Sequence, residues 1–102
     1  IYNYEFLNNE EIPSNFTLLS AYPNPFNPSV NIDFYIDSNS LVSLRVYDMY
    51  GSLVDTLITS EFISTGNHSA VWTPNNMSSG EYIVSLIINE NQVANQKIVY
   101  IK

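Results

Sequence analysis

The residues of this 102-residue chain that could do chemistry are few and scattered. His68 is the only histidine and there is no cysteine, so the chain has no thiolate zinc site and no thiol nucleophile. Without a serine nucleophile in a matching motif, we interpret His68 as structural. The separate carboxylates fall on predicted solvent faces and turns, without the spacing of an acid–base pair or a calcium loop: Asp33, Asp37, Asp48 and Asp55. We therefore predict no catalytic residue, no metal site and no cofactor.

Charge and hydropathy exclude further classes of function. The net charge is −7 with only 3 Lys and Arg residues, which argues against binding to nucleic acid or to anionic lipid. No apolar run reaches the roughly 20 residues of a membrane helix, so we predict no direct membrane insertion. Hydrophobic residues make up 45%, enough for one globular domain. The chain opens on Ile1 rather than Met, which we read as a piece of a longer protein.

Short alternating segments separated by turn residues predict strands. Val30–Asp37 alternates apolar and polar positions, as a strand with one buried face does. Further strands are expected at Phe16–Ala21, Val42–Tyr47, Leu53–Ile58, His68–Thr73, Glu81–Asn89 and Gln92–Lys102. This spacing predicts an all-β domain, an antiparallel immunoglobulin-like β-sandwich of about seven strands. Trp72 and Tyr82 are expected in or near its core.

The first 15 residues differ from the rest. We expect residues 1–15 to form an extension and residues 16–102 to form the sandwich. Ile1–Leu7 is either a frayed terminus or a strand that pairs with an exposed sheet edge. Asn8–Asn15 is polar, acidic and broken by a proline, as a linker is.

A proline box and three glycines mark the turns. The box reads Tyr22, Pro23, Asn24, Pro25, Phe26, Asn27 and Pro28. Prolines fix φ and remove backbone donors, so the box is expected to be a stiff corner that protects a sheet edge, or a surface that a partner contacts directly. Side chains expected to anchor it to the core are Tyr22 and Phe26. Gly51, Gly66 and Gly80 fall in predicted turns that call for positive φ, and Gly80 is expected to tolerate alanine least.

The order of motifs resembles the type A C-terminal sorting domain of the bacterial type IX secretion system. The box stands in FTLLSAYPNPFNP at Phe16–Pro28, and VNIDFYI, VSLRVYDMYGSLV, GNHSAVW, SSGEY and KIVYIK follow in order up to Lys102. Two positions depart from the pattern, Thr73 after the tryptophan and Glu81 before the tyrosine. The residues before Phe16 match nothing in it.

The resemblance implies a carrier function. Such a domain follows an exported cargo domain in the same polypeptide, passes through the periplasm, and is recognised by the outer-membrane translocon that delivers the cargo to the cell surface or the medium. A sortase-like peptidase often removes it, and here the cleavage would fall within Asn8–Asn15. The expected recognition element is the last strand, formed by Lys97, Ile98, Val99, Tyr100, Ile101 and Lys102. A partner would read it by edge pairing and charge, although lysines also protect edge strands from aggregation.

Two other functions fit the same fold. One is a structural or adhesive module that self-associates by lending Ile1–Leu7 to a neighbour. The other is carbohydrate binding through aromatic side chains expected to be exposed, such as Tyr35, Tyr47 and Tyr100.

Overall fold

The computed structural model describes residues 19–102, which form seven strands and no helix. The expected strands at residues 1–7 and 16–18 and the linker at residues 8–15 lie outside this part of the chain. None of the described residues forms a helix able to cross a membrane. The strands are β1 (Leu19–Tyr22), β2 (Val30–Ile36), β3 (Ser40–Asp48), β4 (Leu53–Ile63), β5 (Gly66–Trp72), β6 (Gly80–Ile88) and β7 (Asn91–Tyr100).

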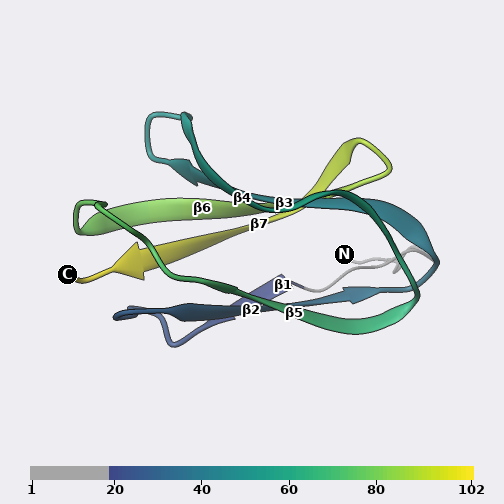
Figure 1. The fold of residues 1–102 in the computed structure, drawn as a ribbon, viewed down its shortest axis with the longest axis horizontal. Coiled ribbons are helices and arrows are strands. Elements are labelled where there is room, and N and C mark those ends of the chain that lie inside the picture. Colours follow the sequence, from purple (N-terminus) through teal and green to yellow (C-terminus); the bar gives the residue numbers. More distant parts are fainter. Residues whose placement is uncertain (1–18) are drawn as a thin grey trace, which may run out of the picture.

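Two sheets stack face to face, which confirms the predicted β-sandwich (Figure 1). One sheet has the strand order β1-β2-β5, and the other has the order β4-β3-β6-β7. Every neighbouring pair of strands is antiparallel. Strand β1 lies near β7 at one side of the sandwich, and β4 lies near β5 at the other.

The core lies between the sheets and follows the sequence alternation. In β2 the buried residues Val30, Ile32, Phe34 and Ile36 alternate with half-buried polar or aromatic ones. Strand β6 is central in its sheet, between β3 and β7, as its nearly continuous apolar sequence predicts. The side chains that fill the core are Phe26, Val30, Ile32, Phe34, Ile36, Val42, Leu44, Val46, Trp72, Tyr82, Val84, Leu86 and Ile98.

Strand β4 extends furthest beyond what the alternation predicts. Strand β4 continues past Ile58 to Ile63, because its pairing with β3 is interrupted rather than ended. The register shifts between Val42 and Leu44, and Ser60 opposite this shift has a positive φ of 46°. Such a bulge changes which side chains face the core, so the period-2 pattern is lost while the strand goes on.

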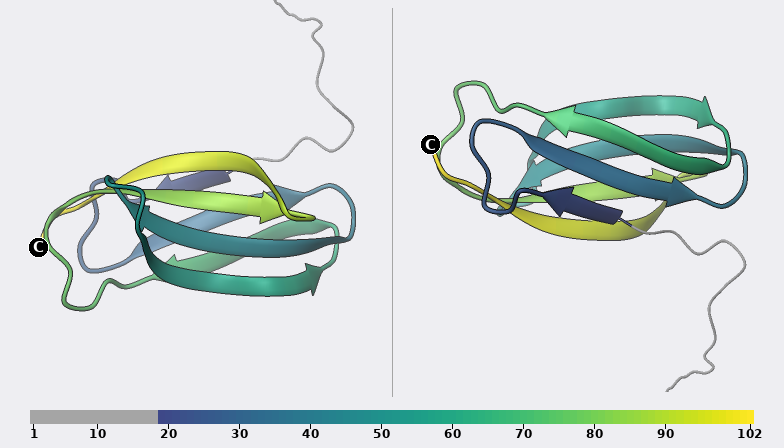
Figure 2. Two further views of the ribbon diagram at one scale, coloured as in Figure 1. Left: turned by 90° about the horizontal axis from the view of Figure 1, so that it is seen from above. Right: turned by 90° about the horizontal axis from the view of Figure 1, so that it is seen from below.

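The two ends of the sandwich differ in what they carry (Figure 2). At the end we call proximal, Leu19 pairs with Phe34, and the β2–β3, β4–β5 and β6–β7 turns lie beside it. The end we call distal carries the β1–β2, β3–β4 and β5–β6 loops together with the last residues, Ile101 and Lys102. The residues that precede the fold therefore join it at the end opposite to its last residues.

Candidate recognition surface

The proline box between β1 and β2 contacts the last strand directly. The Asn24 side chain holds the β7 backbone by two hydrogen bonds, because its Nδ2 donates to the Lys97 carbonyl at 3.0 Å and its Oδ1 accepts from the Val99 N–H at 2.9 Å. A side-chain amide thus pairs with β7 as the peptide groups of a neighbouring strand would.

Phe26 and Asn27 continue this pairing toward the end of the chain. The Phe26 N–H donates to the Val99 carbonyl at 2.9 Å, and the Ile101 N–H donates to the Phe26 carbonyl at 3.1 Å. These bonds form a parallel bridge between Phe26 and Tyr100. The Asn27 Nδ2 donates to the Ile101 carbonyl. We call this set of contacts between Asn24–Asn27 and Lys97–Ile101 the clasp.

The Phe26 ring fixes the clasp to the core. It is 2% exposed, and its centroid lies 5.8 Å from that of Trp72 and 5.2 Å from that of Tyr100. The Tyr82 ring meets Trp72 edge-on at 5.4 Å. Phe26 is therefore part of a series of four aromatic rings in contact, and this packing stabilises the clasp together with the backbone bonds.

Tyr22 does not anchor the box, in contrast to the sequence-based expectation. It is 49% exposed, because it is the last residue of β1 and points to the outer face of its sheet, while Phe26 points inward. A hydrogen bond to the Asp33 carboxylate, together with the negative charge of that group, raises the pKa of the Tyr22 hydroxyl above its usual value of 10.0. Asp33 also accepts a hydrogen bond from Ser69 Oγ at 2.7 Å.

The clasp closes the outer edge of β7 over its last residues. It uses the Lys97 carbonyl and both backbone groups of Val99 and of Ile101. The following N–H, that of Lys102, donates to Ser79 Oγ in the β5–β6 loop at 2.8 Å. A partner strand could pair with this segment only after the box had been displaced.

The positive charge of the last strand is smaller than its two lysines alone indicate. Lys97 Nζ lies 3.8 Å from Glu81 Oε2, and both side chains are about half exposed. Lys102 is exposed. The Glu81 carboxylate therefore offsets part of the positive charge expected at this strand.

Exposed side chains still project from the clasp. Within the proposed recognition strand Ile98 is buried, Val99 and Tyr100 are half-buried, and Lys97, Ile101 and Lys102 are exposed. In the box Phe26 is buried, and its exposed members are Tyr22, Pro23, Asn24, Pro25, Asn27 and Pro28. The structure thus brings the two separately predicted motifs together on one surface.

The three glycines lie at the starts of two strands and in one loop. Gly66 and Gly80 open β5 and β6, with φ of 126° and 156°. Gly51 lies in the β3–β4 loop with φ of 86°.

The side chains that could in principle act in catalysis or bind a metal make structural contacts instead. His68 stacks on Phe34 with centroids 5.6 Å apart, and its Nε2 bonds to the Ser64 carbonyl at 2.7 Å. Asp55 Oδ2 accepts the Trp72 indole N–H at 2.9 Å. In residues 19–102 no group of three or more histidines or acidic residues is placed to hold a metal ion.

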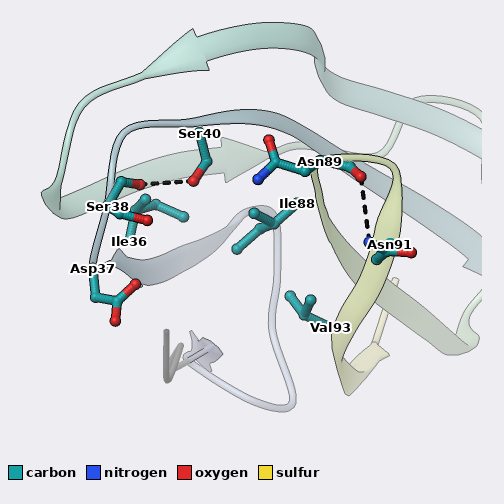
Figure 3. Close-up of a pocket in the computed structure, with 8 residues that line it drawn as sticks. All are labelled: Ile36, Asp37, Ser38, Ser40, Ile88, Asn89, Asn91 and Val93. Atoms are coloured by element: carbon teal, nitrogen blue, oxygen red, sulfur yellow. Dashed lines mark hydrogen bonds between the residues drawn. The ribbon is translucent and has the colours of Figure 1, made fainter. Parts of the chain in front are cut away.

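A pocket at the proximal end is lined by residues of two turns and of the strand ends beside them (Figure 3). Its polar side chains make local hydrogen bonds, since Ser40 Oγ donates to the Ser38 carbonyl at 2.7 Å and Asn89 Oδ1 accepts from the Leu41 N–H at 3.1 Å. Among residues 19–102, Asp37 is the one ionisable side chain that lines it. These described residues therefore offer Asp37 no second acid or base for proton transfer.

The tyrosines expected to be exposed for carbohydrate binding do not share a face. Tyr35 lies on the outer face of the three-stranded sheet and Tyr47 on the outer face of the four-stranded sheet. Tyr100 stacks on Phe26 at the clasp. All three are half-buried rather than exposed, so they do not form a common platform.

The described residues thus form an antiparallel β-sandwich in which the proline box is bonded to the last strand. A family model described as "Secretion system C-terminal sorting domain" matches residues 20–102. The chain belongs to this family, the C-terminal sorting domains of type IX secretion, as its motif order indicates. A search of curated proteins found no match. Family membership supports a role in sorting a larger polypeptide for export toward the cell surface or the extracellular space.

Proposed function

We propose that the outer-membrane translocon recognises this domain, during its passage through the periplasm, by the folded surface that the clasp forms. The observation that supports the proposal is the direct bonding of the box to the last strand. Because the β7 edge is occupied from Lys97 to Ile101, the partner reads exposed side chains of the box and of the strand rather than a free backbone edge.

The same proposal assigns separate roles to the motif residues. Buried members, Phe26 and Ile98 with Trp72 and Tyr82, hold the surface in shape. The exposed side chains Lys97, Ile101 and Lys102 make contact with the partner, together with the exposed prolines and asparagines of the box. A sortase-like peptidase then removes the domain by cleavage within residues 8–15. The domain itself is proposed to be non-catalytic.

A secretion assay with substitutions tests this proposal. A fluorescent protein behind an export signal is joined to residues 1–102 and produced in a bacterium with type IX secretion, alongside a strain that lacks the translocon. K97Q, K102Q and I101S are compared with R45Q. Arg45 is the third basic residue of the chain and lies on β3, away from the clasp. Substitution is preferred to deletion of residues 97–102, because deletion would also remove the bonds that close the fold.

The proposal expects surface or medium fluorescence only in the strain with the translocon. It expects K97Q, K102Q or I101S to lower the secreted fraction several-fold while R45Q leaves it unchanged. Fluorescence of Trp72, the only tryptophan of the 102-residue chain, checks that each variant is folded when it is purified without the fluorescent protein. Equal secretion of all folded variants would refute recognition at the clasp, and retention of the unsubstituted chain in both strains would refute the sorting role.

A further inference from the structure

The SSGEY motif at Ser78–Tyr82 lies beside the clasp but takes no part in it. Its second half begins β6, where Gly80 pairs with Tyr100 and Glu81 pairs with Val99. The clasp bonds to Val99 from the other edge of β7. The end of β7 is therefore held from both edges, by the proline box on one side and by this motif on the other.

The first half of the motif contacts the residues that follow β7. The Lys102 N–H donates to Ser79 Oγ at 2.8 Å, so the β5–β6 loop and this part of the chain lie side by side at the distal end (Figure 2). The residue before it is held from the box, because the Ile101 N–H donates to the Phe26 carbonyl at 3.1 Å and the Ile101 carbonyl accepts from Asn27 Nδ2. Two different loops therefore fix the backbone of Ile101 and Lys102, although both residues lie beyond the last strand.

The position of Ser79 is fixed by the core and by β7. The Tyr82 hydroxyl donates to the Ser78 carbonyl at 2.7 Å, and the Tyr82 ring is 6% exposed and meets Trp72 edge-on. The backbone before Ser79 is thus tied to a buried ring, while the residue after it, Gly80, is paired with β7. Because both neighbours are held, the Ser79 hydroxyl has a defined position, as a preorganised contact requires.

The bond between Ser79 and Lys102 contributes little to stability. Both residues are exposed, so water competes for the donor and for the acceptor. The bond instead restricts the backbone from which the exposed side chains of Ile101 and Lys102 project. Side chains that are ordered before a partner arrives lose less conformational entropy when they bind. A hydrogen bond of this kind therefore favours recognition more than folding.

We propose that Ser79 is a positioning residue for recognition by the translocon. Its hydroxyl holds the Lys102 backbone, so that the exposed side chains of Ile101 and Lys102 leave the fold in one fixed direction. This inference rests on the proposed function, because the direction matters only if a partner reads these two side chains. It gives the SSGEY motif a purpose, since the motif and the box together set the position of one recognition element.

Secretion of the fluorescent reporter fused to residues 1–102 tests this role. S79A removes the acceptor for the Lys102 N–H, and S79T keeps it. S78A is the neighbouring control, since Ser78 bonds to Tyr82 through its carbonyl and not through its hydroxyl. T65A is the matched control, because it removes a side-chain hydrogen bond to the Ile36 carbonyl at the proximal end.

The inference expects an effect of S79A alone. S79A should lower the initial rate of translocon-dependent secretion about three- to tenfold, which is the cost of ordering one or two free side chains on binding. S79T, S78A and T65A should be secreted at the rate of the unsubstituted chain.

A combined substitution separates positioning from a general structural effect. In a chain that carries both I101S and K102Q, the side chains that Ser79 positions are gone. Adding S79A to that chain should change its secretion by less than about twofold. If S79A lowers secretion by the same factor in both backgrounds, Ser79 acts independently of these side chains and the positioning role is wrong.

NMR relaxation of the purified chains, without the fluorescent protein, measures the positioning itself. The order parameter of the Lys102 amide should be near the value of about 0.85 of ordered backbone in the unsubstituted chain and in S79T, and below about 0.6 in S79A. Trp72 fluorescence and Tm should change no more in S79A than in T65A. An equal Lys102 order parameter in S79A and in the unsubstituted chain would overturn the inference.

The outcomes distinguish this inference from the proposed function. If I101S and K102Q lower secretion and S79A is secreted as fast as T65A, the positioning role is wrong and recognition at the clasp stands. If the translocon secretes I101S and K102Q at the rate of the unsubstituted chain, recognition at these side chains is wrong and the positioning role falls with it.

Discussion

Replacing Asn24 by alanine should loosen the last strand. The change removes two hydrogen bonds, from Nδ2 to the Lys97 carbonyl at 3.0 Å and from the Val99 N–H to Oδ1 at 2.9 Å. Each contributes a net of about 0.5–1.5 kcal/mol. Because Asn24 is exposed, water replaces part of both, so we expect N24A to lower the free energy of unfolding by about 1–2 kcal/mol. For a domain of this size that corresponds to a fall in Tm of roughly 5–10 °C.

Hydrogen exchange followed by NMR locates the effect. The Val99 amide loses its acceptor in N24A and should exchange about tenfold faster. Asn67 is an exposed asparagine on β5, in the other sheet, and the matched control N67A should change stability by less than about 0.5 kcal/mol. An unchanged Val99 exchange rate together with an unchanged Tm in N24A would refute the reasoning that Asn24 holds β7.

A carboxylate at this position adds a pH test. N24D keeps the acceptor for the Val99 N–H but places an anionic oxygen against the Lys97 carbonyl, so the ionised form is disfavoured in the folded state. This raises the pKa of the new carboxyl in the folded chain above its unfolded value of about 3.9. The free energy of unfolding that N24D loses relative to the unsubstituted chain should therefore be largest at neutral pH. This loss should shrink as the pH falls and the new carboxyl group is protonated. An equal loss of unfolding free energy at neutral pH and at a pH below the pKa of the new carboxyl group would contradict the proposed geometry.

Three further predictions concern residues away from the β7 backbone. W72F loses the indole bond to Asp55 and part of a buried ring, so urea unfolding should show a loss of about 2–4 kcal/mol, and a loss below about 1 kcal/mol would contradict it. G80A meets no atom within 4 Å but forces a φ of 156° on an L side chain, so thermal unfolding should show a cost of about 1–3 kcal/mol, and an unchanged Tm would exclude strain. D33N should lower the Tyr22 pKa toward 10.0 in a titration followed by NMR, and an unchanged pKa would exclude the Asp33 hydrogen bond.

The sequence predicts the sandwich because its strands bury one face each. The alternation from Val30 to Ile36 defines β2 to within a residue, and the apolar run after Gly80 places β6 at the centre of its sheet. The extension of β4 to Ile63 was not predicted, because the bulge at Ser60 disrupts the alternation. Local pattern thus predicts a strand only as long as its pairing is regular.

The candidate surface is less accessible to sequence reasoning. The box and the last strand are both recognisable as motifs, but nothing local to Asn24 shows that its side chain pairs with Lys97 and Val99. Tyr22 was wrongly expected in the core, because aromatic type alone does not determine which face of β1 it occupies.

The clasp joins residues separated by 73 to 75 positions along the chain. Contacts of such long range form late and slowly in folding, since the intervening loop must close before they are gained. A nascent chain that still lacks β7 cannot make them. Completion of the fold therefore reports that synthesis has passed β7, and products truncated before it would leave the edge of β6 unpaired and open to proteolysis or aggregation.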